Sequence, residues 1–200
     1  MNKEELKEKY GKKRVPHEWC KTDWLTTLVV TFFGSGMSPK APGTMGSLAA
    51  AIVAYPMTVL ACKLFEFESY IFVGSEIFGL FINFFFLAAA LIVFFAAIPF
   101  VNKAMKDTGT EDPGWIVIDE VCGVFMALAF IPCSLIDEYP VYLAIAFGLF
   151  RFFDILKPLG IHKIEKLPGA WGVMADDLLG GLYAAIVLWL GTMIAFLFSF

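Results

Sequence analysis

The chain has 200 residues, of which 59% are hydrophobic and 17% are charged, whereas soluble domains average about a quarter charged residues. This composition, with apolar stretches of about 20 residues, excludes an ordinary soluble domain and predicts an all-α, polytopic membrane helical bundle. The net charge of −4 and the absence of a basic stripe in the sequence argue against nucleic acid as a partner.

The first 23 residues are strongly charged, with seven of the 15 Lys and Arg residues and five acids. We predict that residues 1–23 form a basic cytoplasmic arm that touches anionic headgroups or stays solvated. No linker or internal repeat divides the rest, so residues 24–200 are expected to form a single membrane-embedded domain. The apolar stretch Trp24–Phe33 is too short to cross a bilayer and predicts an interfacial helix.

About five apolar segments, within a range of four to six, are predicted to span the membrane. They are Gly46–Leu64, Phe78–Phe100, Ile116–Ile136, Pro140–Leu156 and Val173–Phe198. The second and fourth connections between them carry lysines, whereas the first and third carry only acidic charges. Because basic loops stay in the cytoplasm, this pattern places the N-terminus and these two connections on the cytoplasmic side.

The stretch SGMSPKAPGTMGSLAA, residues 35–50, precedes the first predicted span. Its glycines allow close backbone approach, Ser38 and Thr44 offer hydroxyl groups, and Lys40 offers a positive charge. A loop of this kind ahead of a helix N-terminus suits an anion such as phosphate. An irregular connection without a ligand explains the same residues, and the spacing of a Walker A loop is absent from the sequence.

Two pairs of adjacent acids open apolar segments, Asp119 with Glu120 and Asp176 with Asp177. Consecutive helical residues point about 100° apart, so one member of each pair is free to face a shared pocket. Carboxylates gathered in this way require a cation, and oxygen ligands suit Mg²⁺. The alternative is that these acids are first-turn residues stabilised by the helix dipole.

The segment FRFFDILKPLGI ends the fourth predicted span and places Arg151, Asp154 and Lys157 three residues apart. This spacing puts the three side chains on roughly one helix face. They form either an Arg–Asp ion pair beside a snorkelling lysine or a carboxylate ligand flanked by two phosphate-binding cations. The predicted orientation brings this segment, both acid pairs and the 35–50 stretch to one membrane face.

Four blocks in this order resemble the phosphatidylglycerophosphatase A family of bacterial membrane lipid phosphatases. The blocks are GSGMSPKAPGTMGSL, DPGWIVIDEVCGV, FRFFDILKPLGI and GAWGVMADDLLGGLYAA, and together they extend from about Gly34 to Ala185. The resemblance implies Mg²⁺-dependent hydrolysis of phosphatidylglycerophosphate, a membrane lipid, to phosphatidylglycerol and phosphate. It also implies a multi-pass protein of the bacterial inner membrane with its active site facing the cytoplasm.

The resemblance assigns roles to the residues singled out above. The acidic catalytic and metal-binding set consists of Asp119, Glu120, Asp154, Asp176 and Asp177. The substrate-binding set consists of Ser38, Lys40, Thr44, Arg151 and Lys157. Mg²⁺ in such a site polarises the phosphoryl group and activates water.

Other functions account for these residues less well. A transporter or ion-coupled carrier uses acids within its spans, but here the acids lie at span ends beside cations. The DG…AR…G…D…D signature of CDP-alcohol phosphotransferases and the DxDx[TV] signature of haloacid-dehalogenase phosphatases are absent from the sequence. The two histidines, His17 and His162, cannot supply the array that membrane histidine phosphatases use.

Overall fold

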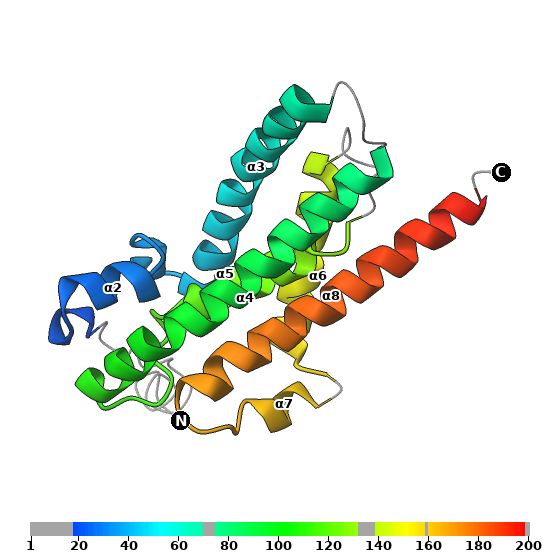
Figure 1. Cartoon of the computed structure of the whole chain (residues 1–200). Helices are drawn as coiled ribbons and strands as arrows, with labels where there is room; N and C mark the ends of the chain where they lie inside the picture. The colour runs from blue at the N-terminus through cyan, green and yellow to red at the C-terminus, as the bar shows by residue number, and fades with distance from the viewer. Residues whose placement is uncertain (1–17, 70–74, 132–138, 159, 199–200) are drawn as a thin grey trace.

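A computed structural model describes residues 18–69, 75–131, 139–158 and 160–198. Within these ranges the chain is helical and contains no strand, which confirms the all-α prediction (Figure 1). The helices are α2 (Trp24–Val30), α3 (Pro42–Ser69), α4 (Ser75–Thr108), α5 (Ile118–Leu128), α6 (Tyr139–Leu156), α7 (Ile161–Ile164) and α8 (Ala170–Phe198). Two 3₁₀ turns, η1 (Trp19–Lys21) and η2 (Ser35–Met37), flank α2.

Three helices of the described chain are long and apolar enough to cross a membrane. Their qualifying segments are Pro42–Ala61 in α3, Leu80–Thr108 in α4 and Ala170–Ala195 in α8. These correspond to the first, second and fifth predicted spans. Their outer faces expose large apolar side chains, and Phe84 and Ile92 are 72% and 67% exposed. Lipid tails accommodate such a surface, so the chain is a membrane protein.

Helix α5 lies inside the bundle and is shorter than the predicted span Ile116–Ile136. It has 11 residues, a length of about 16 Å, whereas the hydrocarbon core is about 30 Å thick. It packs against α3, α4, α6 and α8, and Val121, Cys122 and Leu128 have no exposed surface. Helix α5 is therefore a buried central helix, and residues 132–136 of the predicted span lie outside the described residues.

Helix α6 agrees closely with the predicted segment Pro140–Leu156. It ends in a left-handed turn at Lys157, which has φ +43° and donates its backbone N–H to the carbonyl of Phe153 at 2.8 Å. Glycine usually occupies this position at a helix end because a side chain destabilises the left-handed conformation by about 1–2 kcal/mol.

Glycines allow α5, α6 and α8 to approach closely. A Cβ atom on Gly181 of α8 would overlap the carbonyl oxygen of Gly123 in α5. A Cβ atom on Gly123 would in turn overlap the ring of Phe150 in α6. Small residues at such crossings are typical of helix packing in membranes. These contacts bring the acid-bearing ends of α5, α6 and α8 together.

The helix predicted at Trp24–Phe33 forms between Trp24 and Val30 and is attached to the end of α4. Asp23 caps it by accepting from the backbone N–H of Thr26 at 3.1 Å, and also pairs with Lys103. The neighbouring Thr22 hydroxyl donates to Asp107 at 2.8 Å. The hydrogen bond from Lys103 holds the pKa of Asp23 well below its usual range. Residues 18–23 therefore pack on the bundle, while residues 1–17 lie outside the described chain.

We predict that Gly181→Ala lowers the thermal unfolding midpoint of the detergent-solubilised protein, with a destabilisation of about 1–3 kcal/mol, because the added methyl group separates α5 from α8. Gly191→Ala is the matched control, since it lies in the same helix and its Cβ would meet no atom of a described residue within 4 Å. Equal midpoints for the two variants would contradict the proposed close packing.

Candidate active site

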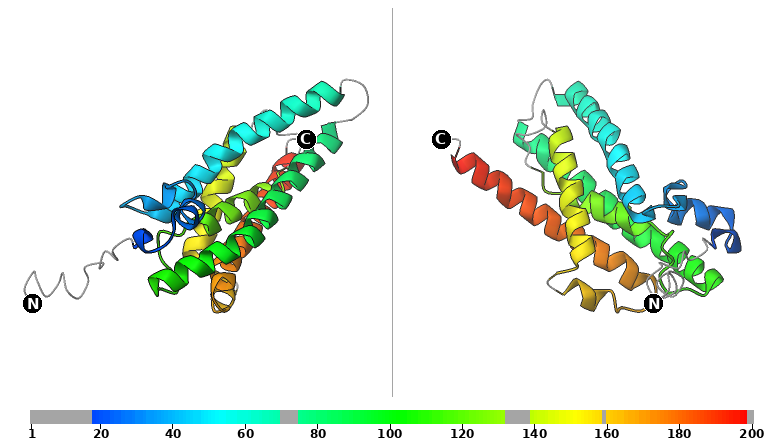
Figure 2. Two further views of the ribbon diagram at one scale, coloured as in Figure 1. Left: turned by 60° about the vertical axis from the view of Figure 1, so that its left-hand side comes forward. Right: turned by 180° about the vertical axis from the view of Figure 1, so that it is seen from behind.

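A cavity of about 700 Å³ lies where one end of each long helix meets the connections between them. Helix α3 leads away from it, α4 returns to it, α5 leads away, α6 returns and α8 leads away (Figures 1 and 2). Its charged lining residues are Glu111, Asp112, Asp119, Glu120, Asp154, Glu165, Asp176, Asp177, Lys157 and Lys166. All five predicted acids therefore line one cavity, as the sequence predicted.

The two acids of α5 have different surroundings. The carboxylate of Asp119 accepts the backbone N–H of Glu120 at 3.0 Å and makes no other hydrogen bond or ion pair with a described residue. Glu120 is 8% exposed and points toward α3 and α6. Both residues lie in the first turn of their helix, where its dipole favours negative charge.

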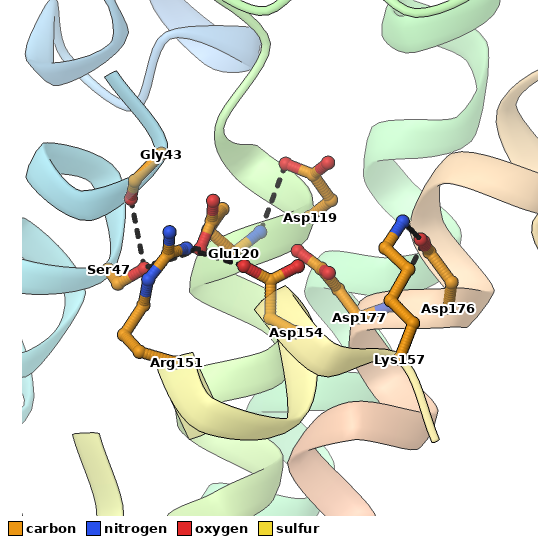
Figure 3. A network of polar contacts seen from close by, with 9 residues as sticks. All are labelled: Gly43, Ser47, Asp119, Glu120, Arg151, Asp154, Lys157, Asp176 and Asp177. Carbon is orange, nitrogen blue, oxygen red and sulfur yellow. Dashed lines mark hydrogen bonds and ion pairs between the residues drawn. The ribbon is translucent and has the colours of Figure 1, made fainter. Parts of the chain in front are cut away.

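Arg151 neutralises two carboxylates from different helices (Figure 3). Its guanidinium pairs with Glu120 of α5 and, at 2.8 Å, with Asp154 one turn further along α6. The same nitrogen lies 3.3 Å from the hydroxyl of Ser47. Arg151 is not among the described residues that line the cavity, so it acts on these carboxylates from behind.

Lys157 provides the second compensating charge. Its ammonium lies 2.6 Å from Asp176 of α8 and 3.2 Å from Glu165 beyond α7. Burial lowers the pKa of Lys157, but the hydrogen bond and charge of Asp176 outweigh burial and raise the pKa above its ordinary value. Lys157 is therefore charged at neutral pH, and its left-handed backbone aims that charge into the cavity.

The acid pair of α8 does not lie in the first turn of its helix, unlike the acid pair of α5. The helix begins at Ala170, three residues before the predicted span, so Asp176 and Asp177 lie beyond its first turn. The helix dipole therefore does not account for them. The carboxylate of Asp177 makes no hydrogen bond or ion pair with a described residue, although the side chain is only 5% exposed.

The start of α8 is positioned by α4. The side-chain oxygen of Asn102 accepts the backbone N–H of Ala170 at 2.9 Å, which satisfies a donor that the helix end leaves free. Gly169 has φ +61°, and a Cβ atom there would lie 2.7 Å from the same oxygen. Asn102 thus fixes the helix that carries Asp176 and Asp177.

The predicted phosphate loop lies beside the cavity. The Ser38 hydroxyl donates to the carbonyl of Lys40 at 2.8 Å, the Lys40 side chain is exposed, and Thr44 lies half-buried in the first turn of α3. None of these three residues is among the described lining residues, although Gly43 is. The structure therefore brings this segment near the acids through its backbone.

Sequence reasoning missed several residues of the site. Glu111, Asp112, Glu165 and Lys166 line the cavity, and Ser47 contacts Glu120. Asp112 stands in one of the four blocks quoted above and Ser47 in another, so membership of these blocks could have identified both residues as candidates. Nothing in the spacing distinguishes Lys166 from Lys163, since both belong to the same lysine-bearing connection.

These features define an integral membrane protein with a compensated acidic site at one end of a helical bundle. The sequence model of the phosphatidylglycerophosphatase A family matches residues 28–192, and the chain belongs to this family. No solved structure shows a significant match to the chain.

Three relatives cover most of the chain. A phosphatidylglycerophosphatase A of Haemophilus influenzae is 40% identical over 80% of this chain and 84% of its own length. The one from Escherichia coli is 31% identical over 81% of this chain and 80% of its own length. A Bacteroides thetaiotaomicron protein named "Putative phosphatidylinositol-3-phosphatase" is 39% identical over 82% of this chain and 92% of its own length.

We predict that Asn102→Ala lowers both stability and activity, because α8 loses its cap, a change of about 1 kcal/mol in unfolding free energy. Asn102→Asp retains the acceptor and should restore most of the unfolding midpoint. Lys106→Ala, an exposed change on the same helix, serves as the control. An Asn102→Ala protein with the midpoint and rate of this control would show that the cap does not position α8.

Proposed function

We propose that the chain hydrolyses phosphatidylglycerophosphate to phosphatidylglycerol and inorganic phosphate, with Mg²⁺ as cofactor. Family membership supports the substrate and reaction. The observation that carries the site is a cavity in which some carboxylates are paired with cations, while Asp119 and Asp177 have no such partner among the described residues. Water supplies the hydroxyl group that joins phosphorus, and the glycerol oxygen leaves with a proton.

The donor chemistry of the cavity fits Mg²⁺. This ion prefers oxygen ligands and is usually held by one or two carboxylates together with water and substrate phosphate. In the part of the chain that the structure describes, no three His, Cys, Asp or Glu side chains are grouped to hold a metal unaided. Asp119 and Asp177 are the carboxylates best placed to bind one, and Glu120, Asp154 and Asp176 remain predicted ligands. Bound Mg²⁺ would supply charge stabilisation and a more acidic water.

The lysines of the cavity provide the positive charge that a phosphate dianion requires. Lys157 is already shared between Asp176 and Glu165, whereas Lys166 makes no hydrogen bond or ion pair with a described residue. We therefore assign Lys166 to the recruitment of substrate phosphate at the rim. Met105, Ile116 and Val173 add apolar surface to the same cavity, next to which the lipid chains would remain in the bilayer.

The proposal includes a location at the bacterial inner membrane, with the cavity facing the cytoplasm. It retains about five membrane passages, with α5 and α6 forming parts of the third and fourth. The alternation of helix direction at the cavity supports this number. It also retains α2 as an interfacial helix, which is supported by the 76% exposure of both Trp24 and Phe33.

We expect purified protein to release phosphate from phosphatidylglycerophosphate in the presence of Mg²⁺ and to stop when EDTA removes it. Asp119→Asn and Asp177→Asn should each lower kcat by at least about 100-fold, equivalent to about 2.7 kcal/mol in the barrier. Both should also weaken Mn²⁺ binding measured by electron paramagnetic resonance, a readout that does not depend on turnover.

The same assay distinguishes substrates and rival functions. Phosphatidylinositol 3-phosphate tests the specificity suggested by the name of the Bacteroides relative. A folded wild-type protein that releases no phosphate from either lipid would contradict the enzymatic proposal. Normal Mn²⁺ binding by both asparagine variants would contradict the assignment of Asp119 and Asp177.

We predict that Lys166→Ala raises KM about tenfold or more and changes kcat little, because the ammonium acts in binding. Lys163→Ala is the matched control, since this exposed lysine belongs to the same segment but is not among the described lining residues. Lys40→Ala in the same series tests the predicted loop contact. Equal KM values for the Lys166 and Lys163 variants would contradict the role of Lys166.

A further inference from the structure

Ser47 is a buried residue whose hydroxyl contacts the charged groups of the acidic site. The residue lies in α3 with no exposed surface. Its hydroxyl is placed to donate to the carboxylate of Glu120 or to the carbonyl of Gly43, at 2.9 Å, and it accepts from Arg151 at 3.3 Å. A hydroxyl bonded to the carbonyl four residues earlier is common in membrane helices. The contacts with Glu120 and Arg151 go beyond that local role.

One turn before Ser47, the backbone of α3 completes the enclosure of Glu120. A Cβ atom on Gly43 would overlap the second carboxylate oxygen of Glu120, so the helix surface and the carboxylate are in direct contact. A buried carboxylate destabilises a protein strongly unless its charge and hydrogen-bonding sites are satisfied. Here Arg151 supplies the charge and Ser47 supplies a further hydrogen bond (Figure 3).

Arg151 links Ser47 and Glu120 to a further carboxylate of the cavity. One terminal nitrogen of its guanidinium contacts Glu120, Ser47 at 3.3 Å and Asp154 at 2.8 Å. Asp154 lines the cavity, whereas Ser47 and Arg151 are not among the described lining residues. The contacts thus connect α3 and α5 to a carboxylate of α6 that lines the cavity.

We propose that Ser47 is a positioning residue, which together with Glu120 orients Arg151 so that Arg151 holds Asp154 in its place in the cavity. This inference rests on the proposed phosphatase function for its kinetic consequence. Its physical basis is that a displacement of about 1 Å in a reacting geometry lowers a rate by about 100-fold. The proposal gives Glu120 and Arg151 a structural partnership in addition to the metal-binding and phosphate-binding roles predicted for them.

The test compares Ser47→Ala with Thr58→Val. Thr58 is also a buried residue of α3, and its hydroxyl likewise bonds to the carbonyl four residues earlier, at 3.0 Å. It therefore reports the loss of a local hydrogen bond without the link to Glu120. We expect Ser47→Ala to lower kcat about tenfold with KM nearly unchanged, and Thr58→Val to leave both near the wild-type values. Equal kcat in the two variants would overturn the proposal.

A double-mutant cycle with Glu120→Gln tests the route of the effect. If Ser47 acts through Glu120, Ser47→Ala should change kcat much less in the Glu120→Gln protein than in the wild type. Undiminished loss in that background would overturn the proposal.

The same cycle is measured in thermal unfolding midpoints, which require no turnover. Ser47→Ala and Glu120→Gln should be non-additive, whereas Thr58→Val and Glu120→Gln should add. If the wild-type protein released no phosphate, the proposed phosphatase function would be wrong, while the midpoints would still test the contact between Ser47 and Glu120. Additive midpoints for Ser47 and Glu120 would overturn it.

Discussion

The ion pair between Arg151 and Glu120 is the interaction on which the rest of the site depends. Five acids from three helices line one cavity, and the repulsion between their like charges opposes the packing of these helices. Arg151 joins α5 to α6 through Glu120 and Asp154, while Lys157 joins α6 to α8 through Asp176. These two cations allow the helix ends to converge and leave Asp119 and Asp177 unpaired within the described chain.

Close helix packing and charge compensation support each other. The approach of α5 to α8 at Gly123 and Gly181 sets the distance between their acid-bearing ends. The cap from Asn102 then fixes where α8 begins, and hence the position of its two acids relative to α5 and α6. A membrane protein gains little from the hydrophobic effect between its helices, so close contacts and polar links of this kind carry much of the association.

The arrangement divides the site by function. A lipid phosphomonoester brings a compact dianion on a long apolar body, and the cavity combines lysines at its rim with apolar side chains from α4 and α8. Lys157 is paired with Asp176 and Glu165, while Lys166 has no such partner among the described residues.

Much of the fold could be read from the sequence because hydropathy is a local property and a bilayer demands helices of defined length. The three long apolar helices α3, α4 and α8 and the meeting of the acids at one end of the bundle were predicted correctly. The end of α5 at Leu128 was not, because the sequence remains largely apolar beyond this residue.

What only the tertiary structure decided is which charge faces which. Neighbouring helical residues point about 100° apart, so spacing along the chain does not show that Glu120 pairs with Arg151 while Asp119 has no such partner among the described residues. Spacing likewise does not show that Lys166 lines the cavity whereas Lys40 is not among the described lining residues, or that Ser47 of α3 contacts Glu120. The sequence by itself determined the membrane helices and the supply of charges, whereas partners distant in the chain determined the role of each charge.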